Sequence, residues 1–151
     1  MNLKKLFISI LIPVGLGALV GFITSGSTNY SNLNQPSFAP PAIVFPIVWT
    51  ILYTLMGISS YIISESNSQN KEKAISTYWI QLIINLLWSI IFFAFDLKVL
   101  AFFWIILLIV FVVKMIKQFL SINKTAGYLQ IPYLLWLIFA AILNLSIIFL
   151  N

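Results

Sequence analysis

VLAFFWIILLIVFVV, residues 99–113, is a run of fifteen residues without a charged or amide side chain. Lys98 and Lys114 lie directly on either side of it. A helix that crosses a bilayer needs about 20 mostly apolar residues, and flanking lysines lengthen a short span because their side chains reach out to the headgroups. The run therefore predicts a membrane-spanning helix over residues 99 to about 116.

The rest of the chain has the same character. Of 151 residues, 62% are hydrophobic and 7% are charged, and the mean hydropathy is +1.08. Soluble domains carry about 25% charged residues, so the composition excludes an ordinary soluble domain. We expect an all-α membrane protein, a single domain over residues 1–151 built as a five-transmembrane-helix bundle. The predicted spans are residues 6–23, 44–63, 75–95, 99–116 and 128–150.

Missing residue types exclude several kinds of chemistry. The chain has no Cys and no His, so we expect no disulfide, no zinc site and no His-ligated haem. The acids Glu65, Glu72 and Asp96 lie between the predicted spans, where they are typical of solvated helix ends rather than of acid–base catalysis. The lysines also lie at span ends, which favours a lipid bilayer over nucleic acid as the partner.

The lysines predict an orientation. Seven of the eight fall on the side of the amino terminus, and Lys98 is alone on the other. By the positive-inside rule we expect a multi-pass plasma-membrane protein with a cytoplasmic amino terminus and an outside carboxyl terminus. Lys4 and Lys5 before an apolar segment also resemble a signal peptide, but the segment exceeds the usual 7 to 15 residues and no convincing cleavage site follows.

The first connection, residues 24–43, is about twenty residues long and uncharged. Loops beyond about 12 to 15 residues commonly act as lids or binding elements. Three prolines stiffen this loop, and Tyr30, Leu33 and Phe38 are apolar anchors that could fold it over the helix ends. We therefore expect it to be an external lid.

Polar and aromatic residues recur at helical spacing in three spans, so each set shares one face of its helix. Amides in such stripes serve either as hydrogen bonds between helices or as ligand contacts, and the sequence leaves both open. Three stripes together favour a cavity for a flat, mostly apolar ligand. The stripes are Trp49, Tyr53 and Gly57; Tyr78, Gln81, Asn85 and Trp88; and Tyr133, Trp136, Ala140 and Asn144.

A further pattern lies in the first span. Gly17 and Gly21 form a GxxxG pair, which lets two helices approach closely. The contact could lie within the bundle or across a homodimer, and the sequence favours neither.

Three segments carry a family resemblance: PPAIVFPIVWTILYTLMG at 40–57, QLIINLLWSIIFF at 81–93 and PYLLWLIFAAILN at 132–144. Together, and in this order, they resemble the TspO/MBR family of tryptophan-rich sensory proteins and translocator proteins, the latter also called peripheral-type benzodiazepine receptors. The resemblance implies a five-helix bundle, often dimeric, that binds porphyrins, haem and drug-like isoquinoline carboxamides. Some bacterial members are reported to degrade protoporphyrin in light.

The resemblance also implies site residues. Trp49 and Trp136 would be the aromatic pair nearest a porphyrin and the candidates for a catalytic role, while Pro40 and Pro41 would shape the lid. Phe38 and Ile43 stand where the family usually has Trp, which weakens the expected stacking of the lid. With the stripe residues included, the predicted ligand site comprises Tyr30, Pro40, Pro41, Trp49, Tyr53, Gln81, Asn85, Trp88, Tyr133, Trp136, Ala140 and Asn144.

These expectations define a function. We predict a tetrapyrrole-binding membrane protein with a sensory, regulatory or protective role, whose ligand is protoporphyrin IX or haem and which needs no other cofactor. Light-dependent porphyrin degradation is an enzymatic form of this prediction. A small transporter of an uncharged metabolite or tetrapyrrole is the alternative, although no inverted repeat supports it. The sterol motif of animal members is absent, so sterol transport is not expected.

Overall fold

The computed structural model describes residues 1–25 and 30–151, which form helices joined by short connections and include no strand. Five helical segments of the described chain are long and apolar enough to cross a membrane, which confirms the predicted fold class. The elements are α1 (Leu3–Thr24), the short 3-10 helix η1 (Tyr30–Asn32), α2 (Val44–Ser64), α3 (Lys71–Ser89), the π-helical η2 (Ile90–Ala94), α4 (Lys98–Ile122), α5 (Lys124–Leu129) and α6 (Ile131–Leu150).

Local residues explain why the fifth span consists of two helices. Asn123 has an extended backbone, with φ −152°, and its side chain accepts a hydrogen bond from the backbone N–H of Ala126, which starts α5. Pro132 lies in the first turn of α6 and has no N–H, so the helical hydrogen bonds are interrupted at Gln130. The predicted span from residue 128 therefore begins at Lys124 and contains a break.

The fourth span is longer than expected. Helix α4 continues to Ile122, so that Lys114 and Lys117 lie inside it. The prediction ended the span near residue 116, shortly after the apolar run of residues 99–113 and just before Lys117. Hydropathy marks where a helix leaves the hydrocarbon, whereas the helix itself continues until Asn123 interrupts it.

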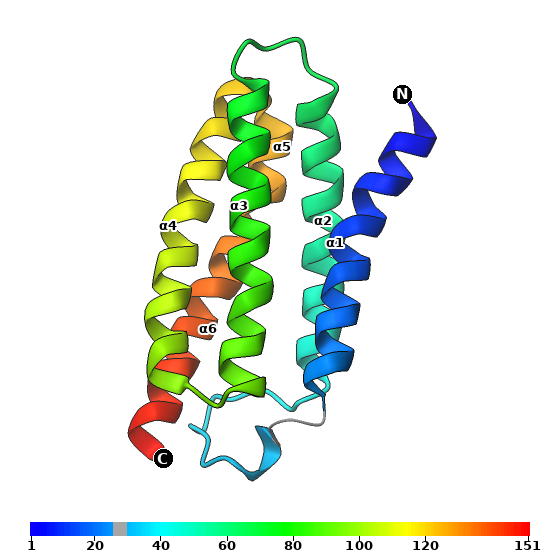
Figure 1. Cartoon of the computed structure of the whole chain (residues 1–151). Helices are drawn as coiled ribbons and strands as arrows, with labels where there is room; N and C mark the ends of the chain where they lie inside the picture. The colour runs from blue at the N-terminus through cyan, green and yellow to red at the C-terminus, as the bar shows by residue number, and fades with distance from the viewer. Residues whose placement is uncertain (26–29) are drawn as a thin grey trace.

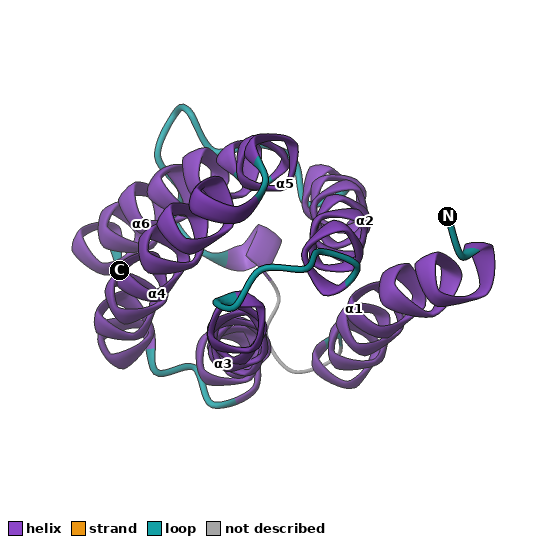
Figure 2. Ribbon diagram, turned by 90° about the horizontal axis from the view of Figure 1, so that it is seen from above, coloured by secondary structure: helices purple, strands orange, loops and turns teal. Residues whose placement is uncertain are grey.

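The helices form a bundle with one loosely attached member. Helices α2, α3, α4 and the α5–α6 pair surround a common interior, while α1 lies to one side and packs mainly against α2 (Figures 1 and 2). The interior contains fully buried side chains such as Met56, Leu108, Phe119 and Leu137. Most of α1 faces outward instead.

The two ends of the bundle differ in what they carry. The amino terminus, the α2–α3 connection and the α4–α5 junction lie at one end, and the carboxyl terminus and the first loop lie at the other (Figure 1). The predicted lid covers residues 24–43, of which 26–29 lie outside the described residues. Its Asn34 hydrogen-bonds the carboxyl-terminal Asn151, so the lid is tied to the end of α6.

Candidate functional site

A cavity of about 940 Å³ lies between α1, α2, α6 and the end of α3 with η2. This volume is at the upper end of the range of roughly 300–1,000 Å³ that is usual for small-molecule sites. None of the described residues that line the cavity is charged, and most are apolar or aromatic. The lining comprises Val14, Gly17, Ala18, Val20, Gly21, Phe22, Thr24, Ser25, Tyr30, Ala42, Phe45, Pro46, Trp49, Thr50, Tyr53, Trp88, Ser89, Phe92, Phe93, Ala140, Leu143, Asn144 and Ile147.

Half of the predicted site residues meet at this cavity. They come from the lid, α2, α3 and α6, segments that are far apart in the sequence but that the bundle brings together. The members of this group are Tyr30, Trp49, Tyr53, Trp88, Ala140 and Asn144.

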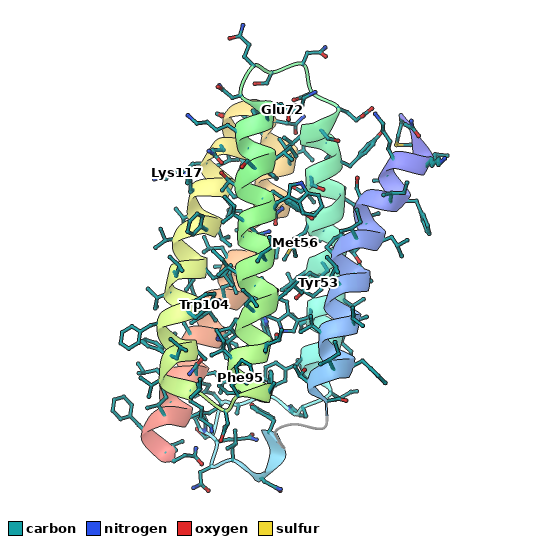
Figure 3. All side chains as sticks on the ribbon, viewed as in Figure 1. Tyr53, Met56, Glu72, Phe95, Trp104 and Lys117 are labelled. Carbon is teal, nitrogen blue, oxygen red and sulfur yellow. The ribbon has the colours of Figure 1, made fainter. Side chains whose placement is uncertain are left out.

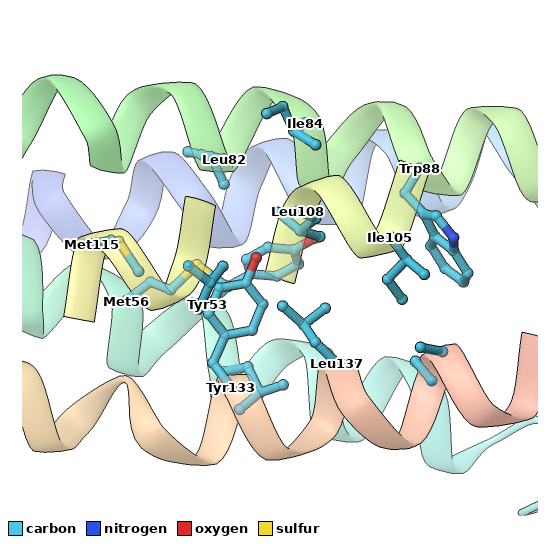
Figure 4. Close-up of a cluster of buried hydrophobic side chains, with 14 of the residues drawn as sticks. Tyr53, Met56, Leu82, Ile84, Trp88, Ile105, Leu108, Met115, Tyr133 and Leu137 are labelled. Atoms are coloured by element: carbon cyan, nitrogen blue, oxygen red, sulfur yellow. The ribbon is translucent and has the colours of Figure 1, made fainter. Parts of the chain in front are cut away.

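Two aromatic pairs supply flat surfaces to the cavity. On α2, the rings of Trp49 and Tyr53 are stacked, with centroids 5.5 Å apart and an angle of 28° between the planes. On the other side, Trp88 of α3 stacks with Phe92 of η2 at 5.2 Å and 23°. Figure 4 shows the Trp88 indole extending from α3 into the space between the helices. The ring faces belong to different helices and line one space.

Three predicted site residues, Gln81, Asn85 and Tyr133, do not line the cavity. They form a hydrogen-bonded network behind it, which Tyr53 connects to the cavity wall. The Tyr53 hydroxyl donates to Asn85 Oδ1 at 2.5 Å, Asn85 Nδ2 donates to the Tyr133 hydroxyl at 2.8 Å, and that hydroxyl donates to Gln81 Oε1 at 2.8 Å. Gln81 Nε2 ends the chain at Met56 Sδ, 3.9 Å away. Tyr53 and Met56 lie midway along the bundle (Figure 3), and Figure 4 shows Tyr133 beside them between the helices. The geometry favours the first of the two roles for Gln81 and Asn85, namely hydrogen bonding between helices.

Trp136 and the lid prolines lie beside the cavity rather than in its wall. The Trp136 ring packs edge-on against Phe45 at 5.8 Å, and it is Phe45 that lines the cavity. Pro40 is half-buried and Pro41 is exposed. Of the predicted aromatic pair, Trp49 lines the cavity and Trp136 does not.

The sequence reasoning missed the contribution of α1 to the cavity. A Cβ on Gly17 would lie 2.3 Å from a ring carbon of Tyr53, so this glycine lets α1 pack against α2 within the bundle. A Cβ on Gly21 would meet no described atom within 4 Å, and this glycine lines the cavity. The GxxxG spacing in the sequence was the signal for this role of α1. It was interpreted only as a contact between helices, whereas a missing side chain can equally leave space for a ligand.

The cavity wall contains polar atoms without hydrogen-bond partners among the described residues. They are the Tyr30 hydroxyl, Trp88 Nε1 and Asn144 Oδ1. A hydrogen bond fixes the orientation of the Asn144 amide, because Nδ2 donates to the backbone oxygen of Lys98 at 3.0 Å. Burial raises the pKa of Tyr30, so its hydroxyl stays protonated at neutral pH and remains a donor.

Comparison with known proteins identifies a family. The family model described as the TspO/MBR family matches residues 9–150. The chain belongs to the TspO/MBR family. Its relatives include the "Tryptophan-rich protein TspO" of Archaeoglobus fulgidus, which is 38% identical over 100% of this chain and 99% of its own length.

Other members of the TspO/MBR family show how widely the similarity extends. The "Tryptophan-rich sensory protein" of Cereibacter sphaeroides is 32% identical over 97% of this chain and 91% of its own length. The human "Translocator protein" is 33% identical over 85% of this chain and 80% of its own length. Family membership and the five apolar helices together identify a multi-pass membrane protein.

Proposed function

We propose that this TspO/MBR protein binds a flat tetrapyrrole in the cavity and thereby serves a sensory, regulatory or protective role. The observation that carries the proposal is the pair of stacked aromatic surfaces, Trp49 with Tyr53 and Trp88 with Phe92, in the wall of one 940 Å³ space. Aromatic rings of a ligand gain from offset or edge-on contact with such surfaces in addition to the gain from apolar burial. The uncharged wall favours a ligand whose macrocycle is neutral.

The donor atoms present favour a metal-free ring over ligation of haem iron. The chain has neither His nor Cys, the usual nitrogen and thiolate ligands of haem. Tyr30 and Tyr53 carry the phenols in the cavity wall. The raised pKa of Tyr30 disfavours the phenolate form that would ligate iron, and the Tyr53 hydroxyl already donates to Asn85. Protoporphyrin IX is therefore the proposed test ligand.

Titrating protoporphyrin IX into the purified protein tests the proposal. The five tryptophans report binding through quenching of their fluorescence. We expect saturable quenching at micromolar ligand, and about tenfold weaker binding by Trp49→Leu, since loss of an aromatic contact with its buried area costs on the order of 1.4 kcal/mol. Trp79→Leu is the matched control because Trp79 is 41% exposed and does not line the cavity. Quenching that rises linearly without saturation would count against a site.

A catalytic form of the proposal is the light-dependent oxidation of the bound porphyrin by dioxygen. The stacked Trp49–Tyr53 pair favours it, because photoexcited porphyrin can take an electron from the Trp49 indole and pass it to dioxygen, which forms superoxide. The Trp49 radical cation then takes an electron back from the porphyrin, and the porphyrin cation combines with superoxide to give the oxidised product. Illuminated wild type should bleach porphyrin faster than empty detergent does, and Trp49→Phe should remove most of the difference. Equal rates in all three samples would leave binding without catalysis.

A further inference from the structure

A groove on α4 lies apart from the aromatic cavity. Its volume is about 480 Å³, and it shares no described residue with the cavity. Along the helix the groove begins with an apolar wall, made by Ile109, Val110 and Val113, and ends with the side chains of Lys114, Lys117 and Gln118. An apolar stretch that leads to two positive charges has the layout of a phospholipid, which joins acyl chains to a phosphate.

The two lysines of this groove have no ionic partner in the described chain. Both are exposed, and no described carboxylate lies within 4.0 Å of either ammonium group. At the other end of α4, in contrast, Lys98 pairs with Asp96. Charged side chains within spanning helices usually have a partner. The groove therefore leaves two positive charges for an anion from outside the protein.

The lysines also lie at the depth of lipid headgroups. A helix rises 1.5 Å per residue, so Lys114 lies about 24 Å and Lys117 about 28 Å from Lys98 along the axis of α4. The hydrocarbon core of a bilayer is about 30 Å thick. With Lys98 at one boundary of this core, the flexible side chains of the other two lysines reach the opposite boundary. The apolar wall then lies at the level of the acyl chains.

We propose that this groove binds an anionic phospholipid, with its phosphate between Lys114 and Lys117 and an acyl chain along the apolar wall. The two lysines are three residues apart on one helical face, so both ammonium groups can donate to oxygens of one phosphate. A zwitterionic lipid carries its own ammonium group, which repels the lysines. Free phosphate lacks the chain that the apolar wall would hold. The proposal does not depend on tetrapyrrole binding, because the two sites share no described residue.

Two lipids with the same acyl chains test the charge requirement. Dioleoyl phosphatidylglycerol has a net negative charge, whereas dioleoyl phosphatidylcholine is zwitterionic. Native mass spectrometry of the detergent-solubilised protein, titrated with each lipid, gives the dissociation constant of the first lipid bound. Wild type should bind phosphatidylglycerol about tenfold more tightly, because both lysines attract its uncompensated charge.

Two double variants locate the effect. Lys114→Gln with Lys117→Gln removes the charges of the groove, so the two lipids should then bind within about twofold of each other. Lys73→Gln with Lys124→Gln is the matched control, because it removes two exposed lysines outside the groove and should keep the tenfold preference. All four side chains are exposed, so both variants should melt at the wild-type temperature in lipid-free detergent.

An excess of inorganic phosphate separates a lipid site from a free-anion site. Compared with chloride at equal ionic strength, phosphate should not displace phosphatidylglycerol, because it gains nothing from the apolar wall. Displacement by phosphate at the concentration of the lipid itself would overturn a lipid as the occupant. Equal binding of the two lipids by wild type overturns the proposal, and so does an equal loss of preference in both double variants.

Discussion

At the scale of single residues, Tyr133 links the two buried amides at the centre of the bundle. Its hydroxyl accepts from Asn85 and donates to Gln81, and both amides are buried. Tyr133→Phe would leave two buried polar groups without these bonds, so we expect a loss of about 1–3 kcal/mol in the free energy of unfolding. Thermal unfolding in detergent measures this loss of stability. Tyr128→Phe is the control, because the Tyr128 side chain is 60% exposed. Ligand affinity should change little, because Tyr133 does not line the cavity; a large loss of affinity with unchanged stability would contradict this assignment.

At Gly57 the backbone of α2 lies close to the backbone of α1. A Cβ there would lie 2.5 Å from both Ile10 Cα and the Ser9 backbone oxygen. Backbone atoms cannot move aside as a flexible side chain can, so Gly57→Ala should destabilise the protein by about 1–3 kcal/mol. Gly15→Ala is the matched control, since its Cβ would meet no described atom within 4 Å and alanine favours the helix by up to about 1 kcal/mol. Equal melting temperatures for the two variants would disprove close packing at Gly57.

At the scale of elements, the lid is held by the end of α6. The backbone N–H of Asn34 donates to Asn151 Oδ1 at 3.1 Å, and Asn151 Nδ2 donates to the Asn34 backbone oxygen at 2.9 Å. Asn151→Ala removes both bonds, each worth about 0.5–1.5 kcal/mol, so amide hydrogen exchange in lid residues 32–40 should accelerate by about tenfold. Asn67→Ala changes an exposed residue in the α2–α3 connection and serves as control. Unchanged exchange in the lid would mean that other contacts hold it.

At the scale of the whole molecule, the lysines separate along the bundle axis. Lys117 lies toward the end that carries the α2–α3 connection, away from the lid (Figure 3). We infer that this end is cytoplasmic and that the lid faces outward, in keeping with the positive-inside rule. The chain has no cysteine, so Ser37→Cys and Gln69→Cys each introduce a single thiol at an exposed position.

A membrane-impermeant maleimide applied to intact cells should label the Ser37→Cys variant in the lid but not Gln69→Cys in the α2–α3 connection. Both should be labelled after the cells are permeabilised, which controls for reactivity. The reverse pattern would show that the bundle is inserted the other way.

Hydropathy and spacing were enough to predict five membrane-length helices and the inward faces of α2, α3 and α6, although the fourth and fifth helical segments extend beyond their predicted bounds. A lysine-bounded apolar run such as residues 99–113 can satisfy its backbone in lipid only as a helix. Helical periodicity then places Gln81, Asn85 and Trp88 on one side, and the structure buries all three. The break at Gln130 was not predicted, because the apolar pattern continues through it.

The sequence by itself determined the five-helix membrane architecture, since apolar length and helical period are local properties of the chain. Only the tertiary structure decided which inward residues meet open space and which meet each other. Gln81, Asn85 and Tyr133 satisfy one another across helices, while Trp49, Trp88 and Asn144 line the cavity. That division depends on how far apart the helices stand, which is set by side-chain packing between segments distant in sequence, such as Gly17 of α1 against Tyr53 of α2.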